Sequence, residues 1–181
     1  MPICSVLSGA LAKACELNAG GVNKIFVTDF ANVTGYTEAA AASPQVGNWL
    51  SAITTSVDFF EIATNKNVCN FQETVNIDLA NGSTFFNQII TLELSRRETT
   101  KRTFIDKLID GQKQVLLIIL DSNGNYWLSG RSEGAYVTAI DGQTGVAKAD
   151  RNGYTITFTA MEPDQAWQVD PAAISALVTY A

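Results

Sequence analysis

The chain has 181 residues, of which 46% are hydrophobic and 17% charged, and this composition is typical of globular rather than disordered proteins. Its formal net charge of -6 argues against nucleic-acid binding through phosphate neutralisation, which needs clustered Lys and Arg. Histidine is absent, which excludes Ser-His-Asp and Cys-His catalysis and removes the commonest metal ligand. The length predicts one domain over residues 1–181.

The three cysteines, Cys4, Cys15 and Cys69, are odd in number and have no C-x-x-C spacing. They indicate neither a disulfide framework nor a zinc site, and no cofactor is expected. Residues 1–15 mimic a signal peptide but have no basic start, and Lys13 interrupts the apolar run, so export is not favoured and synthesis in the cytoplasm is expected. No segment approaches the roughly 20 apolar residues of a membrane span, so no membrane partner is expected.

The first third of the chain predicts two strands separated by a loop. An N-terminal arm over residues 1–20, with helical spacing in part of it, ends at a Gly-Gly pair. Residues 22–30 have the β-branched and aromatic character of a strand. The Ala-rich segment 31–48 predicts a long loop, and residues 53–63 predict one further strand.

Residues 68–94 predict a long hairpin around Asn81-Gly82, because apolar residues alternate along both arms. Each arm is longer than the usual strand of about five to six residues, so the hairpin is expected to extend beyond the core and offer edges to another subunit. The predicted oligomer interface consists of Phe71, Val75, Ile77, Phe86, Ile90, Leu92, Arg96 and Arg97.

A short helix is predicted over residues 99–110, with Thr99 or Thr100 as its cap and Gly111 as its stop. Its apolar face comprises Phe104, Ile105, Leu108 and Ile109. The apolar run at residues 115–120 has no polar face and predicts a central strand buried on both sides.

Residues 121–161 predict a ladder of hairpins, because short β-rich runs alternate with Asn-Gly and Asp-Gly turn signals. Residues 164–181 predict a C-terminal tail that contains Trp167, and its apolar end is expected to dock on another surface. The fold class is therefore mainly β, a sandwich or barrel with one short helix and one long hairpin.

The acidic residues of the last third admit three interpretations. They could form a calcium site, a carboxylate pair for glycoside hydrolysis, or turns, and turns are favoured because Asp before Gly or Asn suits hairpin geometry. Asp121-Ser-Asn-Gly-Asn125 partly matches a calcium loop but has no Glu at the twelfth position. The other acidic residues considered are Asp141, Asp150, Glu162, Asp164 and Asp170.

One small basic cluster comprises Arg96, Arg97, Lys101 and Arg102. It could contact phosphate or meet Asp106 and Asp110 of a neighbouring subunit, but a solvated helix start is favoured. An aromatic platform for sugars could use Trp49, Trp127 and Trp167, although Trp127 is expected in the core.

Several of these elements together resemble small virion structural proteins of tailed phages that infect Bacteroidota, crAss-like phages included. The resemblance rests on Gly20 to Phe30, the 68–94 hairpin, the 99–110 helix, the 115–120 strand, and the segments 121–130 and 150–163. The order of elements is similar to the tail-tube fold of phage tail tubes, tail terminators and type VI secretion tubes.

This resemblance implies a protein without catalytic residues that forms a ring, usually sixfold, with hairpins joining an inner β-barrel through which DNA passes without sequence recognition. It also implies portal, tail or baseplate neighbours and a place in the virion. The first hypothesis is therefore a self-assembling virion protein: a tail tube, tail terminator or connector. The alternatives are a monomeric β-sandwich module that binds carbohydrate or protein through Trp49 or Trp167, and a hydrolase with a carboxylate pair from residues 141–170.

Overall fold

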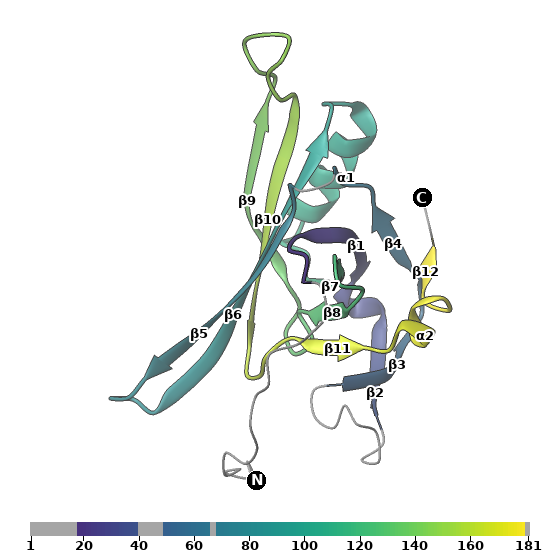
Figure 1. Ribbon diagram of the computed structural model, residues 1–181, viewed down its shortest axis with the longest axis vertical. Helices are drawn as coiled ribbons and strands as arrows, with labels where there is room; N and C mark the ends of the chain where they lie inside the picture. Colours follow the sequence, from purple (N-terminus) through teal and green to yellow (C-terminus); the bar gives the residue numbers. More distant parts are fainter. Residues whose placement is uncertain (1–17, 40–48, 66–67, 180–181) are drawn as a thin grey trace.

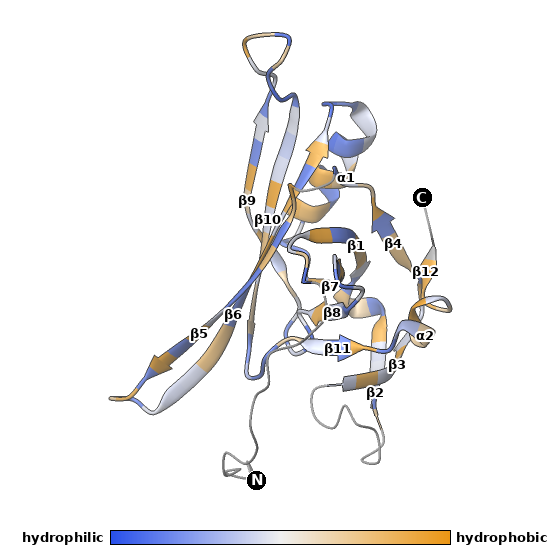
Figure 2. Ribbon diagram, in the orientation of Figure 1, coloured by the Kyte–Doolittle hydropathy of each residue, from blue (hydrophilic) through white to orange (hydrophobic). Residues whose placement is uncertain are grey.

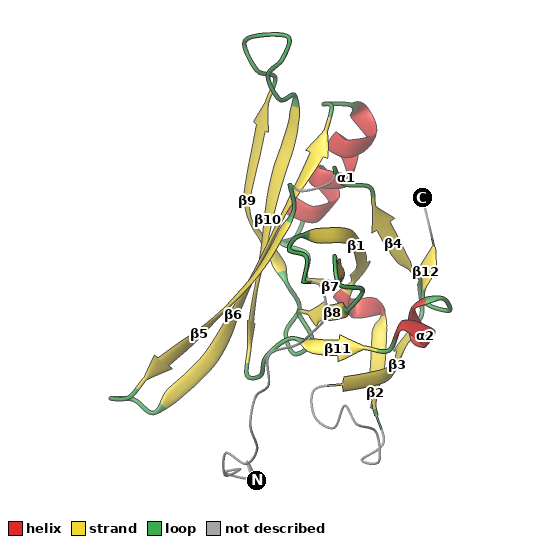
Figure 3. Cartoon of the chain, in the orientation of Figure 1, coloured by secondary structure: helices red, strands yellow, loops and turns green. Residues whose placement is uncertain are grey.

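The computed structural model describes residues 18–39, 49–65 and 68–179. Most of the regular structure consists of strands (Figure 3). The elements are β1 (Val22–Asp29), η1 (Phe30–Asn32), β2 (Val33–Glu38), β3 (Trp49–Thr55), β4 (Phe59–Ile62), β5 (Asn70–Asp78), β6 (Ser83–Ser95), α1 (Thr99–Ile109), β7 (Val115–Asp121), β8 (Tyr126–Ser129), β9 (Tyr136–Gln143), β10 (Gly153–Glu162), β11 (Trp167–Val169), α2 (Pro171–Ile174) and β12 (Val178–Thr179).

The strands form two sheets, which confirms the mainly β fold class. The larger sheet has the order β12-β4-β1-β7-β8-β11-β3-β2, and the smaller one has the order β5-β6-β10-β9. The long strands of the smaller sheet cross one side of the larger sheet and extend past it in both directions (Figure 1). The β5–β6 turn lies at one extreme of the molecule, and the β9–β10 loop lies at another.

The continuous apolar run of β7 contributes side chains to two hydrophobic clusters, one on each face of the larger sheet. Its side chains alternate between the two faces of the larger sheet. Val115, Leu117 and Ile119 pack in a cluster with residues of β6, β10 and α1, so they face the smaller sheet. Leu116 and Ile118 belong to a second cluster with residues of β3, β11 and α2. The predicted central strand is confirmed, because all five of these residues are buried.

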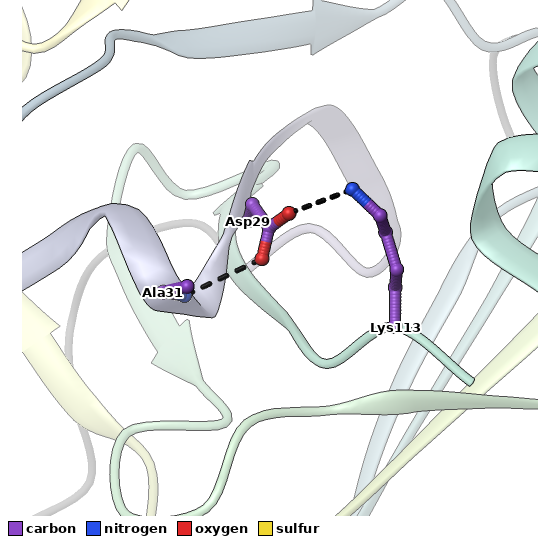
Figure 4. A network of polar contacts seen from close by, with 3 residues as sticks. All are labelled: Asp29, Ala31 and Lys113. Carbon is purple, nitrogen blue, oxygen red and sulfur yellow. Dashed lines mark hydrogen bonds and ion pairs between the residues drawn. The ribbon is translucent and has the colours of Figure 1, made fainter. Parts of the chain in front are cut away.

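The end of β1 is tied to the loop before β7 by an ion pair. Asp29 accepts a hydrogen bond from the backbone N–H of Ala31, the second residue of η1, and its other carboxylate oxygen lies 2.9 Å from Lys113 Nζ (Figure 4). The carboxylate therefore caps the short 3-10 turn while joining two segments that are far apart in sequence.

The first third of the chain differs from the sequence prediction in two places. Residues 33–38 of the predicted loop form β2, an edge strand paired with β3. The single strand predicted over 53–63 is two strands, β3 and β4, separated by a bend at residues 56–58. Edge strands expose much of their surface, and the weak hydrophobic pattern of β2 therefore gave no strand signal. The rest of the predicted loop, residues 40–48, and most of the N-terminal arm lie outside the described residues.

The predicted C-terminal tail is part of the larger sheet, so the interpretation of it as a tail was wrong. Strand β11 pairs with β8 and, in parallel, with β3, while β12 pairs in parallel with β4. Asp170 accepts a hydrogen bond from the backbone N–H of Ala172 at the start of α2. The expectation that the apolar end docks is confirmed, because Ile174 and Leu177 are buried in the second cluster.

The predicted helix is confirmed as α1, and Gly111 follows it with φ +74, the left-handed backbone that glycine adopts easily. The predicted cap was wrong. The capping position is Glu98, whose side chain makes no cap hydrogen bond, whereas Thr99 and Thr100 lie inside the first turn. Two of the predicted apolar positions, Ile105 and Leu108, are buried against the sheets.

The predicted ladder is divided between the two sheets. Strands β7 and β8 form one hairpin and β9 and β10 another, but β8 and β9 belong to different sheets. The chain crosses over at Gly130, which has φ +83. A Cβ there would lie 2.5 Å from the backbone nitrogen of Ala135, so only glycine fits this crossing.

Candidate assembly surface

The β5–β6 hairpin leaves the core halfway along its length. Ile90, Leu92 and Leu94 are buried between the two sheets, whereas residues 72–85 are all exposed. Figure 2 shows hydrophobic segments near the end of β5 and in the turn, at the extreme of the molecule. The predicted hairpin and its extension beyond the core are thus confirmed.

The exposed apolar residues lie on the same face of the hairpin as the residues that are buried closer to the core. Directly paired residues share one face of a sheet, and Phe71 pairs with Ile90, Val75 with Phe86, and Ile77 with Thr84. The face that packs in the core at Ile90 therefore continues outward as an exposed apolar surface. We call Val75, Ile77 and Phe86 the distal stripe. Ile77 is 61% exposed, and Leu79 in the adjoining turn is 92% exposed.

The predicted interface residues fall into three groups. Val75 and Ile77 are exposed, and Phe71 and Phe86 are half-buried. Ile90 and Leu92 were assigned wrongly, because both are fully buried in the protein's own core and have no surface left for a neighbour. Their alternation in the sequence is the same as that of the distal stripe, so the pattern could not separate the two.

Arg96 and Arg97 lie at the opposite end of β6 and are both exposed. Arg96 has a left-handed backbone with φ +61 where the chain turns toward α1. The Arg97 guanidinium lies 5.2 Å from the ring centroid of Tyr154, and its Nε donates to the Tyr154 hydroxyl over 3.4 Å. Arg97 thus packs on β10 of its own chain. These two arginines are not brought together with Val75 and Ile77.

A polar network marks the point where the hairpin leaves the core, and the sequence pattern did not reveal it. The Glu73 carboxylate accepts hydrogen bonds from Gln88 Nε2, over 3.2 Å, and from the backbone N–H of Ala166, over 2.6 Å. Buried Gln88 in turn accepts from the hydroxyl of buried Ser129 over 2.7 Å. The network connects the hairpin to β8 and to the segment before β11, so it sets the direction in which the hairpin projects.

The hairpin turn is held by Asp78. Its carboxylate accepts hydrogen bonds from the side chain and the backbone N–H of Asn81 and from the backbone N–H of Ala80, and these bonds lower the pKa of Asp78. Gly82 completes the turn with φ +65. The turn is therefore defined by local bonds although it has no contact with the core.

A groove opens between α1 and strands β1 and β4 of the larger sheet, and it is formed by residues far apart in sequence. Its volume is about 490 Å³, and its apolar lining comprises Val27, Phe60, Ile62, Leu94 and Phe104. Phe60 is 53% exposed there. We call this surface the α1 groove. A smaller hollow of about 140 Å³ shares three of these residues and continues along α1.

Charged residues of α1 border the α1 groove. Lys101 Nζ lies 2.7 Å from the Glu98 carboxylate and also donates to the backbone carbonyl of Ser95. Lys107 lines both the groove and the adjoining hollow. Of the residues that the structure describes, Lys107 takes part in none of the ion pairs. Glu61 also lines the groove and forms an ion pair with Lys24, so the groove presents an apolar surface with Lys101, Lys107 and Glu61 at its rim.

The acidic residues of the last third do not converge. Asp150 accepts from the backbone N–H groups of Val146 and Ala147 within the β9–β10 loop, and Asp170 caps α2 at another part of the molecule. The described residues contain no group of three or more His, Cys, Asp or Glu arranged to hold a metal ion. The interpretation of Asp150 as a turn residue is confirmed.

Asp121 also serves a turn. Its carboxylate accepts from the backbone N–H groups of Asn123 and Asn125, from the Asn125 side chain and from Trp127 Nε1. Burial raises its pKa, but these hydrogen bonds outweigh it and the net effect lowers the pKa. The segment that partly matches a calcium loop is therefore the β7–β8 turn.

Glu162 belongs to a cluster that the sequence did not predict. Its buried carboxylate accepts two hydrogen bonds from the backbone N–H of Ser132. Burial raises the pKa of Glu162 despite these bonds. The adjacent Arg131 guanidinium lies 3.7 Å from the ring centroid of Trp167 and 5.8 Å from that of Tyr36. Burial also raises the pKa of Tyr36 to about 12.

The tryptophans do not form a common platform. Trp167 is buried under Arg131, and Trp127 is half-buried against the core with its ring nitrogen bonded to Asp121. Trp49 is half-buried at the start of β3. A sugar platform needs exposed ring faces, so this geometry gives the binding-module alternative little support.

No family model, curated protein or solved structure matches this chain. In the part of the chain that the structure describes, no helix has both the length and the apolar character needed to cross a membrane.

Proposed function

We propose that this protein is a non-enzymatic structural protein that assembles with copies of itself into a ring or tube. One observation carries the proposal: the β5–β6 hairpin projects beyond the core with an exposed apolar face. Contiguous exposed apolar surface is uncommon on monomeric proteins and marks interaction sites. Burying it removes apolar area from water, which contributes about 25 cal/mol per Å².

The edges of the smaller sheet support assembly in the same way. In the described part of the chain, β5 and β9 are its outermost strands. An edge strand presents unpaired backbone N–H and C=O groups that can pair with another chain. Because β5 and β9 are different surfaces, a contact that joins the β5 side of one copy to a different surface of the next copy is head-to-tail, which generates a ring if the rotation closes.

The resemblance to tail-tube proteins supports a more specific proposal: a tail tube, tail terminator or connector in a phage virion, hexameric in keeping with the sixfold symmetry usual in that family, with portal, tail or baseplate proteins as neighbours. A net charge of -6 suits a channel through which DNA slides, because negative charge repels the phosphates.

The test is the mass of the purified full-length protein in solution, measured by light scattering over a roughly hundredfold range of concentration, with negative-stain images of the same samples. Rings or tubes are expected for the wild-type protein. Ile77→Lys is expected to abolish them, because a lysine in the distal stripe would have to be desolvated at the contact.

Met161→Lys is the matched control, because Met161 on β10 is 50% exposed and belongs to neither the distal stripe nor the α1 groove. It is expected to assemble like the wild type. A wild-type protein that stays monomeric at every concentration would contradict the proposal. Equal loss of assembly in both lysine variants would show that the hairpin has no special role.

A further inference from the structure

The α1 groove and the distal stripe are complementary in character. The groove is lined by apolar side chains from four elements, and exposed Phe60 lies within it. The distal stripe is a narrow apolar surface on a two-stranded ribbon that projects into solvent. Each surface exposes apolar area that the protein's own fold leaves uncovered.

We propose that the distal end of the β5–β6 hairpin of one copy docks in the α1 groove of the next copy. This inference rests on the proposed self-assembly and names the contact that produces it. The side chains of the distal stripe pack against Phe60 and Phe104, and the hairpin turn lies next to α1.

The two surfaces cannot meet within one chain. Strand β6 runs from the hairpin turn at Ser83 to Ser95, and Leu94 lines the α1 groove. At about 3.3 Å per residue, the groove lies more than about 30 Å from the turn. Figure 1 shows the turn and α1 on opposite sides of the molecule. The contact is therefore head-to-tail, and successive copies form a ring or a filament.

The charges of the two surfaces favour the same pairing. At the distal end, residues 75–86 carry one acidic residue, Asp78, and no Lys or Arg. The groove has Lys101 and Lys107 among its lining residues, together with Glu61, which forms an ion pair with Lys24 outside the groove lining. Opposite charges at the edge of an apolar contact raise the association rate and fix its register.

The first test compares single variants of the full-length protein by light scattering and sedimentation. Ile77→Lys in the hairpin and Phe60→Lys in the groove are each expected to raise the dissociation constant about tenfold or more. Met161→Lys is the matched control for Phe60→Lys, because Met161 is 50% exposed on β10 and lies outside both surfaces. Circular dichroism checks that each variant is folded.

Lys107→Glu tests the groove without changing its apolar lining, in case Phe60→Lys fails to fold. It is expected to weaken assembly, and the difference from the wild type should shrink at high salt. Lys148→Glu in the exposed β9–β10 loop makes the same charge change away from the groove and is expected to assemble normally.

The decisive test mixes the two lysine variants. The Ile77→Lys copy keeps an intact groove, and the Phe60→Lys copy keeps an intact hairpin. Their mixture is therefore expected to form a one-to-one heterodimer and nothing larger, because the remaining surfaces of that dimer are the two defective ones. The mass of the mixture in solution is compared with the mass of each variant alone, and a dimer mass is expected only for the mixture.

The outcomes separate this inference from the proposed function. If Ile77→Lys is monomeric but both groove variants assemble like the wild type, the protein self-assembles and the hairpin docks elsewhere, which overturns the inference alone. If the groove variants fail while Ile77→Lys assembles, the groove takes another occupant, such as residues 1–17, and the inference is again overturned. A wild-type protein that is always monomeric overturns both.

Discussion

The two halves of the β5–β6 hairpin have the same alternating pattern and opposite surroundings. Near the core, Ile90, Leu92 and Leu94 are buried between two sheets. Further out, Val75 and Ile77 lie on the same face of the ribbon and are exposed. The difference is not in the residues themselves but in what lies opposite them. The larger sheet covers the inner half, and nothing in the described chain covers the outer half.

An alternating apolar pattern therefore indicates that a face makes a contact, but it does not identify the partner that covers the face. The inner half finds its partner in its own chain, and we propose that the outer half finds it in a second copy. The polar network of Glu73, Gln88 and Ser129 lies at the boundary between the two halves. The following predictions test how different the halves are.

The largest effect is expected from a matched pair of isoleucine substitutions. Ile90→Ala removes a fully buried side chain and is expected to lower the free energy of unfolding by about 3 kcal/mol. Ile77→Ala is expected to change it by less than about 0.5 kcal/mol in the monomer. Urea denaturation at low protein concentration measures both. Equal losses would mean that the outer half is covered within its own chain.

Two glycines sharpen the comparison at the level of the backbone. Both Gly130 at the sheet crossing and Gly82 at the hairpin turn have positive φ, but only at Gly130 would a Cβ collide with neighbouring backbone. Gly130→Ala is expected to cost about 2 kcal/mol or more, because strain and collision add. Gly82→Ala carries the strain alone and is expected to cost about 1 kcal/mol. Thermal and urea unfolding test the order, and a larger loss for Gly82→Ala would contradict it.

A smaller effect is expected at the polar boundary. Ser129→Ala removes the hydroxyl that donates to Gln88 and leaves a buried amide oxygen without that donor, so a loss of about 1 to 2 kcal/mol is expected. Ser83→Ala at the exposed start of β6 is the control and is expected to stay within about 0.5 kcal/mol. If the two variants are equally stable, the network does not contribute to holding the hairpin.

The smallest effect is a pH dependence of stability, which has opposite signs for buried Glu162 and for Asp78 in the exposed hairpin turn. Burial raises the pKa of Glu162 above its ordinary 4.5. At a pH between the ordinary pKa of the unfolded chain and the raised pKa of the folded protein, Glu162 is protonated in the folded protein and ionised in the unfolded chain. The free energy of unfolding therefore rises as pH falls through the raised pKa. The wild type should therefore gain stability relative to Glu162→Gln as pH is lowered from neutrality toward the ordinary pKa of 4.5.

Asp78 at the tip behaves in the reverse way. The hydrogen bonds from Asn81 and Ala80 lower its pKa below the ordinary 3.8, so its contribution is complete above that value and is lost as pH falls further. Over the pH range in which Glu162 titrates, Asp78→Asn should show no change in stability relative to the wild type. Unfolding curves of the three proteins across this range measure both signs, and a pH-independent Glu162→Gln difference would contradict the first.

Strong local patterns predicted the elements that depend on nearby residues. The hairpin, α1 with Gly111, and the buried β7 were all evident, because turn residues, helical spacing and an unbroken apolar run are local signals. Strands β2, β11 and β12 were missed. β11 and β12 have only three and two residues, too few to show a pattern, and they pair with strands distant in sequence. β2 has six residues but is an edge strand with a weak hydrophobic pattern.

The candidate site could be predicted only in part for the same reason. Val75 and Ile77 were identified from their alternation, but Ile90 and Leu92 were assigned to the same surface because alternation shows which face is apolar and not how far the cover extends. The α1 groove was not predicted at all. Its lining residues Val27, Phe60, Leu94 and Phe104 come from four different elements. The groove therefore exists only once these elements have packed together, and no local sequence pattern indicates it.

The sequence by itself therefore determined a mainly β protein with a long hairpin, one helix, a central strand with two apolar faces, and turns built on Asp, Asn and Gly. Tertiary structure decided where the hairpin leaves the core, which apolar residues remain exposed, and where the groove opens. The physical reason is that backbone geometry and side-chain periodicity are local properties of the chain, whereas burial depends on which distant segments come to lie opposite each residue.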